Sequence, residues 1–175
     1  MVASDPASPD RAKELARRSF ALMQRWDDAE AALVIHPDGV NHESSAEPPA
    51  TRGRGPHAYR ATSEWLHAAY DDLSWDVHEL VSDGELVVAR VTMSGRHTRP
   101  FAVYSPDGTL DQVFAPTGRR FQVGQMHMFR VRDGMLADHW ANRDDLGQAR
   151  QLGWVPPTPM FLLRGALLKR RLRRG

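Results

Sequence analysis

The chain has 175 residues, of which 41% are hydrophobic and 26% are charged, and it contains no cysteine. This length suits one domain with a sizeable core, and the composition excludes an intrinsically disordered chain. The absence of cysteine excludes disulfides, thiolate nucleophiles, iron–sulfur clusters and cysteine-ligated zinc.

The formal net charge of +1 conceals an uneven distribution of charge. Residues 160–175 contain six Lys and Arg and no Asp or Glu, which leaves 17 basic and 22 acidic residues, a net charge of −5, in residues 1–159. Because a nucleic-acid-binding domain needs a basic face, we expect no nucleic-acid partner. No signal peptide and no apolar run of membrane-spanning length is present, so we expect a cytoplasmic protein.

Helices are expected in the first part of the chain. Ser8, Pro9 and Asp10 are typical of a helix start, because they supply an N-cap, a first-turn proline and an acidic first turn. Apolar residues recur at helical spacing, and Pro37 and Gly39 break the pattern. The expected helices span residues 9–26, 27–33 and 56–73.

After Asp71 the hydrophobic pattern changes from the helical period to alternation. Asp-Gly pairs at 83–84 and 133–134 are typical of tight hairpin turns. A short helix that starts at the aspartates 144–145 and ends at Gly153 closes the domain. Helices followed by antiparallel strands indicate an α+β fold, which we interpret as a curved sheet wrapping an internal pocket. The expected strands span residues 74–81, 85–94, 121–132 and 135–142, with a further strand around 101–104.

Motifs for cofactor and metal chemistry are missing from the sequence. It has no glycine-rich phosphate loop after a strand, no His-Glu-x-x-His motif and no Gly-x-Ser-x-Gly elbow. We therefore expect no cofactor and no metal. Catalysis would come from polar side chains in an otherwise apolar pocket.

The most informative segment is the hairpin of residues 124–142. Strand alternation places Gln125, His127 and Phe129 on one face of its first strand. A histidine on a pocket wall can act as acid or base near neutral pH, because unperturbed imidazole titrates at about 6.5.

Two registers are open for this hairpin. A two-residue turn at 133–134 aligns His127 with Trp140. In this register the second strand is shifted by one residue, so that Asp138 instead of His139 faces the pocket. A three-residue turn aligns His127 with His139. We favour the second register, because it separates an amphipathic pocket from a packed face. Its pocket face carries Gln125, His127, Phe129, His139 and Ala141.

Residues 127–140 read His-x-Phe-Arg-x-x-Asp-Gly-x-x-x-Asp-His-Trp, which resembles the signature hairpin of the SnoaL-like polyketide cyclases, within the NTF2-like group. Residues 40–43 resemble the Asn-His loop of that family, and residues 95–98 resemble its Gly-Thr-His-Thr segment. The resemblance covers roughly residues 10–154. It implies an NTF2-like cone, in which N-terminal helices and a strongly curved, mostly antiparallel sheet wrap a pocket, and it implies a homo-oligomer such as a homodimer.

The resemblance also implies roles for individual residues. In these cyclases an Asp directly after the His-Trp pair is the general acid/base of an intramolecular aldol ring closure, and Gln, His and Asn hold the substrate and its enolate. Gln125, His127 and Asn41 match those residues, whereas Ala141 occupies the Asp position. We therefore assign His127 as the acid/base, Gln125 and Asn41 as hydrogen-bond donors, and His139 as supporting partner. Candidate substrate-binding residues are His42, His97, Phe129, Trp65 and Ala141.

The expected protein is a cofactor-independent SnoaL-like enzyme of antibiotic biosynthesis. It would cyclise, isomerise or eliminate by proton transfer next to a carbonyl of a polyketide-like or other cyclic small molecule. Ala141 leaves two alternatives open: a non-catalytic small-molecule-binding protein with the same pocket, or a hydrolase or hydroxylase of the same family.

We expect three segments along the chain: an N-terminal arm of residues 1–9, a SnoaL-like domain of residues 10–155 and a basic tail of residues 156–175. The tail has leucines interleaved with basic residues. It is either an amphipathic helix that contacts an anionic membrane or a partner, or a solvated terminus.

Overall fold

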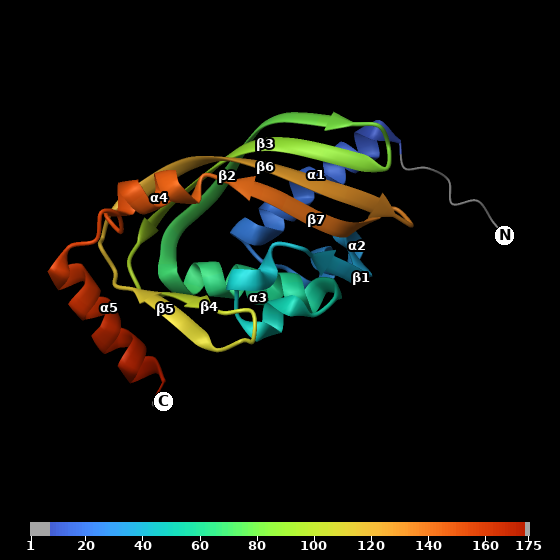
Figure 1. Cartoon of the computed structure of the whole chain (residues 1–175). Helices are drawn as coiled ribbons and strands as arrows, with labels where there is room; N and C mark the ends of the chain where they lie inside the picture. The colour runs from blue at the N-terminus through green and yellow to red at the C-terminus, as the bar shows by residue number, and fades with distance from the viewer. Residues whose placement is uncertain (1–7, 174–175) are drawn as a thin grey trace.

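The computed structural model describes residues 8–173, so most of the expected N-terminal arm, residues 1–7, lies outside the described residues (Figure 1). The helices are α1 (Pro9–Gln24), α2 (Asp28–Val34), η1 (Ser44–Ala46), η2 (Pro49–Arg52), α3 (Gly55–Ala69), α4 (Asp145–Leu152) and α5 (Pro159–Leu172). The strands are β1 (Ile35–Asn41), β2 (Tyr70–Ser82), β3 (Leu86–His97), β4 (Phe101–Tyr104), β5 (Leu110–Phe114), β6 (Arg120–Arg132) and β7 (Met135–Arg143).

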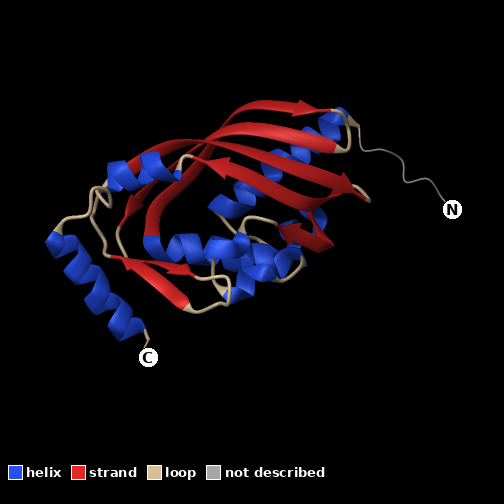
Figure 2. Cartoon of the chain, in the orientation of Figure 1, coloured by secondary structure: helices blue, strands red, loops and turns tan. Residues whose placement is uncertain are grey.

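Five strands form one curved sheet in the order β1-β7-β6-β3-β2, in which only the β1–β7 pair is parallel. Strands β4 and β5 form a separate two-stranded ribbon. Figure 2 shows the sheet arching over α3 and this ribbon, with α1 lying along the sheet. The expected α+β architecture with a strongly curved, mostly antiparallel sheet is confirmed.

Local capping residues explain where the helices begin and end. The Ser8 hydroxyl accepts a hydrogen bond from the backbone N–H of Arg11, and the Asp144 carboxylate accepts one from that of Gly147. Gly153 ends α4 with a left-handed φ of 73°, a conformation that costs glycine little. The apolar face of α1 is buried in the core, and this helix packs on β2 and β3.

Two strands were not expected from the sequence. Strand β1 occupies a segment in which Pro37 and Gly39 broke the helical pattern, and it pairs with β7 about 100 residues further along the chain. An edge strand tolerates proline because one row of its backbone groups has no partner strand. Strand β5 pairs only with β4, in the excursion of residues 95–118.

The three-residue turn predicted for the β6–β7 hairpin is wrong. Arg132 pairs with Met135, which leaves a two-residue turn of Asp133 and Gly134 with φ values of 51° and 72°. Both residues therefore have the positive φ that a type I′ hairpin turn requires.

A β-bulge next to this turn compensates for its length. The register shifts between Arg130 and Val131, with Ala137 as the additional residue of β7. His127 consequently pairs with Ala141, not with His139, although both histidines still face the same side of the sheet. Because of the bulge, the residues predicted for the pocket face do share one face of the sheet, although the predicted pairing of His127 with His139 is wrong.

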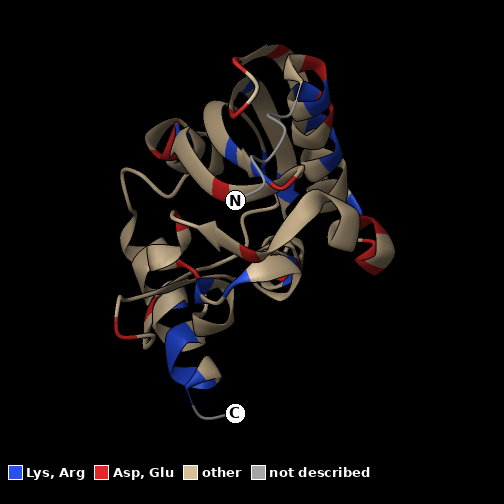
Figure 3. Ribbon diagram, turned by 90° about the vertical axis from the view of Figure 1, so that its right-hand side faces the viewer, with Lys and Arg blue, Asp and Glu red and all other residues tan. Residues whose placement is uncertain are grey.

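The basic tail forms a helix, α5, which lies against β5 at one end of the molecule. The Arg173 guanidinium donates a hydrogen bond of 3.0 Å to the carbonyl of Leu110, and Lys169 donates to that of Asp111. Figure 3 shows the basic residues gathered on this helix. In residues 8–173 no helix has both the length and the apolar character that a membrane span needs. Exposed apolar side chains of α5 are Met160, Leu162, Leu163, Leu167 and Leu172.

A glycine at the start of α3 should be required for stability. Gly55 has a φ of +70°, and a Cβ atom there would collide with the backbone carbonyl of Pro37. We expect Gly55→Ala to lower the free energy of unfolding by about 1–3 kcal/mol, as measured by urea denaturation. Gly124→Ala is the matched control, because a Cβ atom at that strand position has no neighbour within 4 Å. Equal unfolding midpoints for the two variants would contradict this prediction.

Candidate active site

An internal cavity of about 330 Å³ lies between the inner face of the sheet and the helices α1 and α3, with the β4–β5 ribbon along one side. Its lining is mostly apolar and includes Phe20 and Trp75. The polar or ionisable side chains in the lining are Ser19, Asn41, Glu47, Tyr59, Thr62, Tyr70, Gln125, His127, His139, Arg143, Asp145 and Gln148. A mostly apolar cavity with polar groups on its walls is typical of a small-molecule site.

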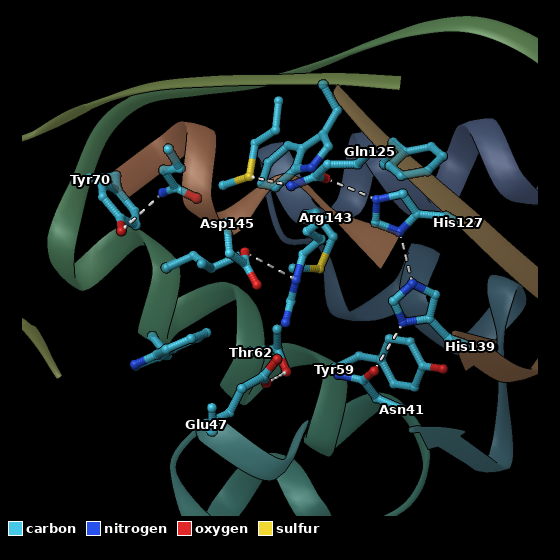
Figure 4. Close-up of a pocket in the computed structure, with 18 of the residues that line it drawn as sticks. Asn41, Glu47, Tyr59, Thr62, Tyr70, Gln125, His127, His139, Arg143 and Asp145 are labelled. Atoms are coloured by element: carbon cyan, nitrogen blue, oxygen red, sulfur yellow. Dashed lines mark hydrogen bonds and ion pairs between the residues drawn. The ribbon is translucent and has the colours of Figure 1, made fainter. Parts of the chain in front are cut away.

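A continuous chain of hydrogen-bonding side chains runs along one wall of the cavity (Figure 4). His139 Nδ1 lies 3.0 Å from Asn41 Oδ1, and His139 Nε2 lies 2.9 Å from His127 Nδ1. His127 Nε2 in turn lies 2.9 Å from Gln125 Oε1, and the Gln125 amide donates to the sulfur of Met93. The structure therefore brings together the four residues to which the sequence analysis assigns catalytic roles.

The proton positions in this chain follow from its first member. Asn41 Oδ1 accepts a hydrogen bond from the backbone N–H of Glu43, so it is the oxygen of the amide, and His139 Nδ1 must donate to it. In a neutral pair His139 Nε2 then accepts from His127 Nδ1, which leaves His127 Nε2 without a proton. Because Gln125 presents an oxygen to that nitrogen, the arrangement accommodates one additional proton at His127 Nε2.

Burial keeps both imidazoles neutral at neutral pH. His127 is 7% exposed, and its burial, together with the positive charge of Arg143, lowers its pKa to about 3. The ring of His139 lies against Phe129, with a centroid distance of 4.8 Å, and burial holds its pKa well below the ordinary value. Protonation of both rings would also place two positive charges side by side, which lowers the pKa of His139 further. The pair is consequently a weak base whose lone pair is available at neutral pH.

Phe129 and Trp65, two of the candidate substrate-binding residues, line the cavity. The Trp65 indole donates a hydrogen bond of 2.8 Å to the carbonyl of Ala102, which fixes its ring beside the β4–β5 ribbon. Ala141 lies on the inner face opposite His127, but it is not among the residues that form the cavity wall.

His42 and His97 were also candidates, and neither lines the cavity. His42 stacks on Trp140 at a centroid distance of 4.6 Å and lies 2.9 Å from the Asp138 carboxylate. Because alternation turns Asp138 and Trp140 away from the pocket face, His42 is held on the outside of the sheet. His97 is fully buried and packs against the ring of Tyr70.

Several polar cavity residues had no signal in the sequence. Glu47 lies in the Pro-rich segment between η1 and η2, is 1% exposed, and accepts a hydrogen bond of 2.6 Å from Thr62. Arg143, at the end of β7, brings a cation to the cavity, 3.8 Å from the Asp145 carboxylate. Tyr59 donates to the carbonyl of Val40. These residues can be identified as part of the cavity only from the structure, because segments far apart in the sequence bring them together.

Metal ligands are not gathered anywhere in the described part of the chain. Within residues 8–173 no group of three or more His, Asp or Glu side chains is arranged to hold a metal ion.

Most of the chain is similar to proteins of one known family. The family model described as SnoaL-like polyketide cyclase matches residues 13–152. The aklanonic acid methyl ester cyclase DnrD of Streptomyces peucetius is 33% identical over 147 residues, which are 83% of this chain and 93% of that protein. The nogalonic acid methyl ester cyclase of Streptomyces nogalater is 31% identical over 134 residues, 74% of this chain and 86% of that protein. Among solved structures, TsrD from Streptomyces laurentii has a TM-score of 0.65 and 30% identity, covering 82% of this chain and 96% of its own.

Proposed function

Because the chain belongs to the SnoaL-like polyketide cyclase family, we propose that it closes a ring in a polyketide-like ester by an intramolecular aldol reaction. The observation that carries this proposal is the neutral pair His127–His139, with its nitrogens 2.9 Å apart, in the wall of an apolar cavity. The names of the relatives state methyl esters of aklanonic and nogalonic acid as their substrates, and we propose an ester of this class here.

The proposed reaction begins with proton transfer from carbon to nitrogen. His127 Nε2 removes a proton from the carbon next to a carbonyl, and His139 stabilises the resulting imidazolium by hydrogen bonding to its Nδ1–H. The amides of Gln125 and Asn41 donate hydrogen bonds to the enolate or carbonyl oxygen, and Phe129 packs against the substrate. The enolate carbon then attacks a second carbonyl of the same molecule, which forms the ring.

Ala141 supports a second candidate function, a non-catalytic protein that binds the same class of molecule. Aklanonic acid methyl ester, added without any cofactor, distinguishes the two. We expect the wild-type protein to convert it into a cyclised isomer of unchanged mass, detected by chromatography and mass spectrometry. If the wild type only binds the ester, and Ala141→Asp beside His127 introduces turnover, the binding function would be supported instead.

We further propose a homo-oligomeric cytoplasmic protein whose α5 contacts an acidic partner or an anionic membrane. The basic residues and exposed leucines of this helix support such a contact. Sedimentation that detects only a monomer would contradict self-association, and equal binding of neutral and anionic vesicles would contradict an electrostatic contact.

A further inference from the structure

The proposed aldol reaction requires an acid as well as a base, and Ala141 occupies the position of the family's acid/base aspartate on the inner face of the sheet. As the enolate carbon attacks, negative charge develops on the oxygen of the second carbonyl, which must finally take up a proton. Ala141, the cross-strand partner of His127, has no proton to give. A proton donor on another wall of the cavity would separate the two roles, with His127 as the base and that donor as the acid.

Glu47 is a buried carboxyl group in that cavity, and the proposed chemistry has not yet used it. It is 1% exposed, whereas the side chain of Asp145, the other carboxyl in the lining, is 73% exposed. Figure 4 shows Glu47 and Thr62 at the lower edge of the cavity, with Asn41 and His139 at its lower right. Glu47 is therefore an enclosed acid in the cavity that the histidine pair faces.

The surroundings of Glu47 shift it toward its protonated form relative to a solvated glutamate, and they still stabilise the carboxylate. Burial raises the pKa of Glu47, and hydrogen bonding by Thr62 together with the charge of Arg143 opposes this rise without reversing it. Thr62 can satisfy either state: its hydroxyl donates to the carboxylate at 2.6 Å, or it accepts from the carboxylic acid and donates to the carbonyl of Ala58 at 3.4 Å.

We propose that Glu47 is the general acid of the ring closure, the catalytic residue that protonates the attacked carbonyl oxygen. This inference rests on the proposed aldol function. His127 takes the proton from carbon, the new carbon–carbon bond forms while the carbonyl π electrons move to oxygen, and the Glu47 O–H bond breaks to give the hydroxyl. Transfer of the imidazolium proton to the Glu47 carboxylate restores the enzyme, so substrate and product are isomers.

The test compares Glu47→Gln with wild type on aklanonic acid methyl ester. Loss of a general acid usually reduces the rate by about 100-fold or more, but a glutamine amide still donates a hydrogen bond to the oxygen. We expect kcat to fall about 10- to 100-fold, with KM changed less than threefold. Any decrease of kcat with rising pH that the deprotonation of Glu47 causes should also disappear, because no acid is left to deprotonate. Glu43→Gln, four residues before Glu47 and outside the cavity lining, should match wild type.

A second measurement does not depend on turnover. When the wild type is acidified, the C=O stretch of a protonated carboxylic acid should appear in its infrared spectrum at a higher pH than for a solvated glutamate, and Glu47→Gln should lose this band. An active wild type with a Glu47→Gln variant within threefold of its kcat would overturn the role of Glu47, as would absence of that band. A wild type with the band but without turnover would contradict the aldol function itself.

Discussion

Replacing His127 by alanine should lower kcat on the cyclisation substrate by at least about 100-fold, because general base catalysis typically contributes 100- to 10,000-fold. His127 Nε2 is the position in the hydrogen-bonded chain that can take up a further proton, because the other unprotonated nitrogen, His139 Nε2, already accepts a hydrogen bond from His127. His139→Ala should have a smaller effect, about tenfold, because His139 stabilises the imidazolium without touching the reacting carbon. Steady-state kinetics at neutral pH measures both effects.

The control for this experiment is His57→Ala, because His57 is an exposed histidine of α3 outside the cavity lining. Its kcat should equal that of wild type. Urea denaturation of each variant separates lost catalysis from lost structure. A folded His127→Ala variant that keeps kcat within threefold of wild type would exclude His127 as the base.

Local sequence patterns predict this fold well where neighbouring residues determine the structure. Ser8 and Asp144 cap helices as their side chains indicate, and alternation along β6 correctly places Gln125 and His127 on the inner face. Strand β1 is different, because its partner β7 lies about 100 residues away and its own Pro37 argues against regular structure.

The hairpin register shows the same limit at the candidate site. The two-residue turn at Asp133-Gly134 alone would turn His139 away from the pocket, and the bulge at Ala137 returns it. Bulges have no dependable local signal, so the grouping of His127 with His139 was reached through an incorrect pairing. Glu47 lies in a Pro-rich segment without periodicity, and only its tertiary contacts with Thr62 and the cavity identify it.

Acidification from pH 7 to pH 5 should lower the free energy of unfolding by about 4 kcal/mol. Burial lowers the pKa of His127 to about 3 and that of His97 to about 4, whereas both titrate at about 6.5 when unfolded. Between the native pKa values and the unfolded pKa of about 6.5, the unfolded chain binds protons that the native protein does not bind. The free energy of unfolding therefore falls as the pH falls. Each histidine contributes about 2 kcal/mol at pH 5, and His139 acts in the same direction.

The carboxyl group of Glu47 offsets part of this dependence, whereas that of Asp107 does not contribute to it above pH 5. The raised pKa of Glu47 acts in the opposite direction, because the native protein then binds a proton before the unfolded chain does. Asp107, whose pKa is lowered to about 2 by hydrogen bonds from Ser105 and Thr109, loses its contribution only below its unfolded pKa of about 4. The histidines therefore dominate between pH 5 and pH 7.

His97 allows this acid sensitivity to be separated from catalysis, because it lies outside the cavity lining. Its Nε2 is buried without a hydrogen-bond partner, and its ring packs against Tyr70 and Trp154, so an imidazolium there would have no anion beside it. His97→Gln should reduce the stability difference between pH 7 and pH 5 by about 2 kcal/mol in urea denaturation, and His57→Gln should not. If all three proteins lost the same free energy on acidification, buried His97 would not be a source of the acid sensitivity.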